Sequence, residues 1–132
     1  MVNLIKKRSE KAKLEDKLDN RWSLIVRNRA KNRCEICGNT QNLNSHHIVT
    51  RTNKRLRWDL KNGVSLCVKH HVFGSEAVHE NALFFDNWFI KHRKNDRKYL
   101  LKEMYSIKQW QVWELKELLE TFDNMLKTGN FS

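Results

Sequence analysis

Two short stretches determine the fold of this chain: CEIC at residues 34–37 and CVKH at residues 67–70. In each stretch two metal-binding residues are separated by two others, a spacing that lets both side chains face one ion from a tight turn. Three thiols and one imidazole predict a closed, tetrahedral zinc site, and Gly38 after the first stretch supports this. The alternative is three buried thiols acting as small hydrophobic side chains. The predicted ligands are Cys34, Cys37, Cys67 and His70.

The 29 residues between the two stretches exceed the separation usual in small zinc fingers, so this segment should have structure of its own. We expect a strand at residues 44–49, a polar loop, and a turn leading into a second short strand at residues 62–66. His46 and His47 are adjacent on the first strand, so their side chains should point to opposite faces and take different roles. The amide of Asn62 can hold two backbone segments in register.

Helical patterns flank this middle region. The expected features are a helix over 8–32, an N-cap at Asn81, an interruption at 95–96, a last helix near 108–127 and a stop at Gly129. The aromatic and aliphatic stripe of the last helix, which includes Trp110 and Trp113, is expected to belong to the core. The predicted fold class is therefore α+β and mostly helical, with the whole chain forming one domain.

The charge of the chain is strongly basic. Lys and Arg number 26 against 15 Asp and Glu, for a formal net charge of +11, and residues 1–33 hold 11 of the basic residues against four acidic ones. One interpretation is a basic helical arm that lies against nucleic-acid phosphates, and the alternative is a solvated helix surface with local charge pairs. No apolar run has the length of a membrane span, and no signal peptide is recognisable, so a cytoplasmic location is expected.

The order of these motifs resembles the HNH endonuclease superfamily, the ββα-metal nucleases, in the zinc-containing form found in phages and mobile elements. The matching pattern is Cys34-x-x-Cys37, then Leu43-x-x-His46-His47-Ile48, then Asn62-x-x-x-Leu66-Cys67-x-x-His70-His71. Two positions depart from many relatives: His70 replaces a fourth Cys, and His46 replaces an Asp. Imidazole is an ordinary zinc ligand, and at position 46 it suits transition-metal ions better than Mg²⁺.

The resemblance implies a ββα-metal core over 34–80, between the N-terminal arm (1–33) and C-terminal helices (81–132). It implies a metal-dependent DNA endonuclease that leaves 5′-phosphate and 3′-hydroxyl ends. His47 would be the general base, Asn62 would fix the loop that orients it, and His46 and His71 would bind one catalytic ion, Mg²⁺, Mn²⁺, Ni²⁺ or Co²⁺. The Cys3His zinc would be structural. Arg51, Arg55 or Arg57 would clamp the scissile phosphate.

His79 has two interpretations. It lies eight residues after His71, about 12 Å along a continuous helix, too far for both to bind one ion. A break at Gly74-Ser75 could return the chain and make His79 a third ligand; otherwise it forms a local hydrogen bond.

DNA is the expected partner, with a phage packaging or recombination protein as a further candidate and a monomer or homodimer as the assembly. The residues expected to bind nucleic acid are Arg27, Arg29, Lys31, Arg33, Arg51, Lys54, Arg55 and Arg57. The alternative function is a non-catalytic, zinc-stabilised nucleic-acid-binding module. Such a module has no need for the ordered residues His46, His47, Asn62 and His71, so these favour the enzyme.

Overall fold

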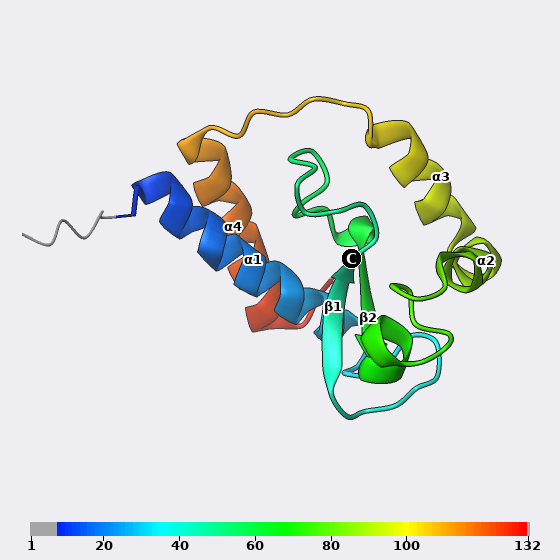
Figure 1. Cartoon of the computed structure of the whole chain (residues 1–132). Coiled ribbons are helices and arrows are strands. Elements are labelled where there is room, and N and C mark those ends of the chain that lie inside the picture. Colours follow the sequence, from blue (N-terminus) through cyan, green and yellow to red (C-terminus); the bar gives the residue numbers. More distant parts are fainter. Residues whose placement is uncertain (1–7, 132) are drawn as a thin grey trace, which may run out of the picture.

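The computed structural model describes residues 8–131, so residues 1–7 of the expected basic arm lie outside it. Within that range the chain forms a mostly helical α+β fold with a two-stranded antiparallel sheet. The elements in chain order are α1 (Glu10–Arg29), β1 (Leu43–His47), η1 (Leu60–Asn62), β2 (Gly63–Cys67), η2 (Lys69–Phe73), α2 (Ala82–His92), α3 (Lys94–Glu103) and α4 (Val112–Thr128). In Figure 1 the sheet stands between α1 with α4 on one side and α2 with α3 on the other.

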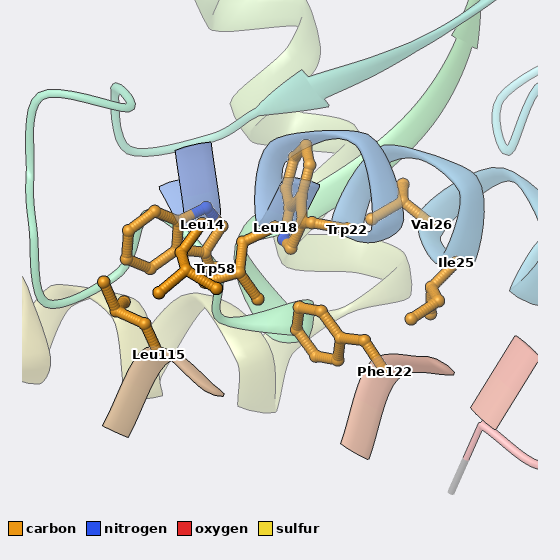
Figure 2. Close-up of a cluster of buried hydrophobic side chains, with 8 residues drawn as sticks. All are labelled: Leu14, Leu18, Trp22, Ile25, Val26, Trp58, Leu115 and Phe122. Atoms are coloured by element: carbon orange, nitrogen blue, oxygen red, sulfur yellow. The ribbon is translucent and has the colours of Figure 1, made fainter. Parts of the chain in front are cut away.

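Helix α1 is part of the core, not a projecting arm. Its apolar residues recur every three or four positions, so they share one face, which packs against α4. Ser9 begins the helix by accepting a hydrogen bond from the Ala12 N–H, and Lys31 and Asn32 end it because both have positive φ. Figure 2 shows the buried cluster, which consists of Leu14, Leu18, Trp22, Ile25, Val26, Trp58, Leu115 and Phe122.

The sheet presents small residues to α1. In the antiparallel register Ser45 lies opposite Ser65, and His47 lies opposite Gly63. Ser45 Oγ donates a 2.6 Å hydrogen bond to a backbone carbonyl of α1. A Cβ on Gly63 would lie 2.3 Å from Val26 Cγ2, so the absence of a side chain there lets α1 approach the sheet closely.

Strand β1 ends two residues earlier than the sequence pattern predicts. Ile48 N–H still donates to the Asn62 carbonyl, but Val49 N–H donates instead to the Asn62 side chain. The amide therefore takes the backbone of β1 out of the ladder and starts the long connection to η1.

The other side of the sheet packs against the second helical pair. Val64 and Leu66 of β2 share a buried cluster with Phe85 and Phe89 of α2 and with Leu100 of α3. Residues at alternating positions of a strand face opposite sides, so one face of the hairpin packs against α1 while the other contributes Val64 and Leu66 to this cluster.

The C-terminal helices follow the predicted pattern with three differences. Asn81 caps α2 as expected, its side chain accepting from Phe84 N–H, and Gly129 ends α4 with φ of 72°. The interruption falls at Arg93 rather than at 95–96: its backbone is not helical, with φ of −139° and ψ of 47°, and its guanidinium donates to carbonyls of the η1–β2 segment.

The last helix begins at Val112 rather than near residue 108. A capping box between Gln111 and Glu114 sets its first turn. Leu115 and Phe122 are buried as expected, but Trp113 is 62% exposed, so the prediction that the whole stripe is core is wrong at that position. None of the helices in residues 8–131 combines the length and apolar character that crossing a membrane requires.

Candidate metal centres and the surroundings of His47

The four predicted zinc ligands come together in one cluster, with their ligand atoms all within 4.8 Å of one another. Cys37 Sγ lies 3.7 Å from Cys67 Sγ, and His70 Nδ1 lies 3.7 Å from Cys34 Sγ and 3.4 Å from Cys67 Sγ. Tetrahedral thiolate ligands about 2.3 Å from zinc are about 3.8 Å apart. The donor set and its spacing therefore fit a zinc-like ion.

Local backbone structure shapes both halves of this cluster. Gly38, with φ of 77°, donates its N–H to the Cys34 carbonyl and closes the first turn. Burial raises the pKa of the Cys67 thiol, but hydrogen bonds from the backbone N–H groups of His70 and Lys69 and from the neighbouring thiols outweigh it. The pKa of Cys67 therefore lies below its ordinary value, which favours the thiolate that a metal requires.

Three histidines form a second cluster: His46 on β1, His71 on η2 and His79 in the turn before α2. The two Nε2 atoms of His71 and His79 are 3.1 Å apart, and the His46 ring centroid lies 5.1 Å from each of the other two. Two nitrogen ligands about 2.0–2.1 Å from one ion are separated by about the 3.1 Å found here between the Nε2 atoms of His71 and His79. This group also fits a single metal ion.

The position of His79 follows from a chain reversal after η2. Gly74 N–H donates to the Lys69 carbonyl and ends the π-helical turn, and Val78 N–H then donates to the His70 carbonyl. The chain returns alongside η2, which brings His79 beside His71. The chain reversal that the third-ligand interpretation requires is therefore present, and in it His79 also lies within hydrogen-bonding distance of His71.

Burial keeps His46 and His71 of the three-histidine cluster neutral. It lowers the pKa of His46 to about 3, with further lowering by the charges of His71, His79 and His47. Burial also lowers the pKa of His71, with a smaller contribution from His79. Neutral imidazoles offer lone pairs, so His46 and His71 are in the protonation state that binds a metal at neutral pH.

His47 points away from this cluster, toward α1. Its ring stacks on Trp22 with centroids 3.8 Å apart and planes within 7°, and its Nε2 lies 2.8 Å from the Arg57 carbonyl oxygen. A carbonyl can only accept, so Nε2 carries the proton, and in the neutral ring Nδ1 has a free lone pair. Burial lowers the pKa of His47, outweighing the opposing effects of the Arg57 carbonyl and of Asp19.

Asn62 closes the loop that carries Arg57. The residue is fully buried, and its side-chain N–H groups donate to the carbonyls of Val49 and Leu56 while its oxygen accepts from Val49 N–H. These three hydrogen bonds connect Asn62 to Val49 and Leu56, so one side chain holds both parts of the loop. The expected role of the amide, to hold two backbone segments in register, is confirmed.

Two residues for which the sequence predicted no role at this site support the arrangement: Asp19 and Trp22, three positions apart on α1. Asp19 accepts hydrogen bonds from Arg57 at 2.7 and 3.0 Å and from Trp58 Nε1 at 2.8 Å. The sequence shows that the two residues share one face of a helix. It does not show that this face contacts Arg57 and Trp58, nearly 40 positions after Asp19.

Several expected nucleic-acid-binding arginines are instead bound within the fold. Arg57 is 8% exposed and pairs with Asp19 and Glu15, so it is not directed to solvent as a phosphate clamp. Arg29 donates to the carbonyls of Leu60 and Gly63.

The remaining expected nucleic-acid-binding residues differ in how accessible they are. Arg55 is held by Tyr99 and by Asp59 and Glu103, and Arg27 donates to Ser23. The exposed members of the expected set are Lys31, Arg33, Arg51 and Lys54, of which Arg51 also pairs with Asp19.

Compared with protein-family models, curated proteins and solved structures, the chain has no significant match. Its function has therefore to be inferred from the geometry of its own side chains.

Proposed function

We propose that this chain is a metal-dependent DNA endonuclease of the ββα-metal (HNH) type. The observation that carries the proposal is the pair of adjacent histidines on β1. His46 belongs to a three-histidine cluster that fits an ion, while His47 is held with Nδ1 unprotonated by the Arg57 carbonyl. A metal-binding imidazole beside an oriented, neutral one is the combination that hydrolysis of a phosphodiester by a general base and a metal ion requires.

The chain order of the elements supports this type. Two antiparallel strands are followed at once by a helical turn, and β1 and η2 supply His46 and His71. The helical component is a five-residue π-helical turn, and His79 joins from the segment after it. The Cys3His cluster lies at the junction of β2 and η2, where a bound zinc would hold strand and turn together.

The proposed roles follow from what each side chain offers. His47 Nδ1 accepts a proton from the attacking water, and Trp22 and the Arg57 carbonyl keep the ring in place. Asn62 fixes the loop that provides this carbonyl. His46, His71 and His79 would hold one divalent ion. Such an ion, when bound, supplies Lewis-acid stabilisation of charge on the phosphate and on the leaving 3′-oxygen.

DNA as the substrate is supported by charge. The net charge of +11 favours a polyanion, and the exposed Lys31, Arg33 and Lys54 remain available to bind phosphates, whereas the exposed Arg51 pairs with Asp19. Arg57 and Arg29 are left out of this set because the fold itself uses their guanidinium groups.

Nicking of supercoiled plasmid in the presence of Mn²⁺ or Ni²⁺ tests the proposal. The wild-type chain should produce nicked circles, and His47→Ala should reduce the rate by about 10²–10⁴-fold. His92→Ala is the matched control, because this exposed histidine lies at the end of α2 outside both clusters. Plasmid binding without any nicking would favour the non-catalytic nucleic-acid-binding module instead, and nicking by His47→Ala at the wild-type rate would remove His47 from the mechanism.

A further inference from the structure

A cavity of about 330 Å³ lies between the N-terminal half of α1, the loop before Trp58 and the segment leading into α4. Its lining combines lysines with tryptophans. The lining residues that matter here are Lys11, Glu15, Lys54, Trp58, Lys108 and Trp110. None of them belongs to the two metal-binding clusters, so the cavity is a separate feature of the molecule.

The aromatic wall of the cavity is held rigidly. The rings of Trp58 and Trp110 meet edge to face with centroids 5.5 Å apart. Trp58 Nε1–H donates to Asp19, and Trp110 Nε1–H donates to the Lys54 carbonyl at 2.8 Å. Both indole donors are therefore in use. What the half-buried Trp110 offers to a ligand is ring surface, not a hydrogen bond.

The charges around the cavity favour an anion. Lys11 and Lys54 are exposed, and within residues 8–131 neither has an ion-pair partner. Lys108 lies over the Trp110 ring at 4.8 Å, but its charge is paired with Glu114, so Lys11 and Lys54 are the lysines left to meet an anion. The acidic Glu15 is paired with Arg57, which offsets its charge.

We propose that this cavity holds one unstacked nucleotide of the DNA substrate, with its base against Trp110 and its phosphate between Lys11 and Lys54. Bases stack on aromatic side chains whatever their identity, and lysines neutralise the attached phosphates, so this pairing of residue types matches a nucleotide. The volume lies in the range of small-ligand pockets. The proposal rests on DNA being the substrate but not on its hydrolysis.

The separation between the cavity and His47 can be compared with the spacing of nucleotides along a DNA strand. Glu15 lines the cavity and Trp22 stacks on His47, and Trp22 lies seven positions after Glu15 on α1, about 10 Å along the helix axis. That is about three base steps of a DNA strand. A base inside a duplex presents only its edge, so a base lying against Trp110 must leave the stack. The site would therefore favour DNA with an unpaired nucleotide about three steps from the cut.

Fluorescence anisotropy with the full chain and no added divalent cation tests the proposal. The probes are a short labelled duplex and the same duplex with one extra, unpaired nucleotide. The wild-type chain should bind the second probe about tenfold more tightly or better. Lys11→Gln combined with Lys54→Gln should remove most of this preference. Gln109→Trp, which places a large side chain at the cavity lining without changing charge, should do the same.

The matched control is Lys13→Gln combined with Lys17→Gln, which removes the same charge from exposed positions of α1 that do not line the cavity. It should weaken binding of both probes equally and keep the preference. If the wild-type chain binds both probes equally, or the two lysine pairs behave alike, the cavity is not a nucleotide site while the endonuclease proposal stands. If neither probe nor plasmid is bound, both proposals fail.

Discussion

His47 donates its Nε2–H to the backbone carbonyl of Arg57 across a distance of 2.8 Å, and this bond decides which nitrogen of the ring is free. The position of the Arg57 carbonyl is fixed by contacts outside its own loop as well as within it. The Arg57 side chain is anchored to Asp19 of α1, one helical turn before the Trp22 ring on which His47 stacks. One face of α1 therefore supports His47 both directly and through Arg57.

Asp19→Asn should show whether the charge of Asp19, rather than its packing alone, supports Arg57 and His47. The substitution keeps the size but removes the charge that holds Arg57, so we expect the free energy of unfolding to fall by about 2 kcal/mol. We also expect the nicking rate to fall while metal content is retained. Asp123→Asn is the control: it breaks an exposed ion pair with Arg21 and should cost at most about 1 kcal/mol. Equal effects of the two changes on unfolding and nicking would contradict this role for Asp19.

The stability due to Asp19 should depend on pH. Partial burial raises the pKa of Asp19, but hydrogen bonds from Arg57 and Trp58 and the charges of Arg57 and Arg51 outweigh it, so the pKa lies below its ordinary value. A lowered pKa in the folded state gives stability that is present above the ordinary value, near 4, and is lost as pH falls through the lowered one. In urea unfolding, the difference between wild type and Asp19→Asn should be constant near neutral pH and shrink below about pH 4. A difference that grows toward acid pH would have the wrong sign.

The Cys3His cluster should hold one ion tightly. Structural zinc contributes about 10–16 kcal/mol of apparent binding energy in small peptides, comparable with the stability of a whole domain. Cys67→Ser should therefore yield unfolded or aggregated protein, and metal analysis of the wild type should find close to one zinc per chain after mild EDTA treatment. Folded, active protein without zinc would disprove the structural role.

The three-histidine cluster should bind its ion more weakly. Mild EDTA should stop nicking without changing the far-UV dichroism, and Mn²⁺, Ni²⁺ or Co²⁺ should restore it at least as well as Mg²⁺, because imidazole suits transition-metal ions. His46→Ala, His71→Ala and His79→Ala should each shift the metal titration to higher concentration, whereas His92→Ala should not. Nicking supported by Mg²⁺ alone would contradict an all-imidazole site.

The basic residues at and just after the C-terminal end of α1 should divide into two classes. Lys31→Gln with Arg33→Gln should flatten the dependence of DNA affinity on salt, by up to about 0.9 for each phosphate that the variant no longer neutralises, and leave stability unchanged. Arg29→Gln should instead lower the unfolding temperature, because its guanidinium binds the carbonyls of Leu60 and Gly63. An unchanged salt slope in the first variant would make both residues ordinary surface charges.

Features encoded locally could be predicted from the sequence. The paired spacing of the cysteines anticipated the Cys3His cluster, and Asn81 and Gly129 marked helix ends because capping depends on side chains within one turn. The alternation of a strand also placed His46 and His47 on opposite faces.

Features that depend on packing between distant segments could not be predicted. The position of His79 required the reversal after Gly74, which the sequence left open. The use of Arg57 within the fold depends on Asp19, 38 residues earlier, and local sequence gives no measure of such a pairing. Trp113 matched the spacing of a buried stripe, but the neighbouring elements leave it exposed.

The close packing around Gly63 should constrain which residues can occupy positions 22, 26 and 63 in related chains. Gly63 lies opposite His47, and any Cβ there would come within 3 Å of both Val26 and Trp22. A larger residue at position 63 is therefore acceptable only if position 22 or 26 becomes smaller, and a smaller residue at 22 removes the surface on which His47 stacks. In homologous chains that keep His47, these three positions should change together or not at all.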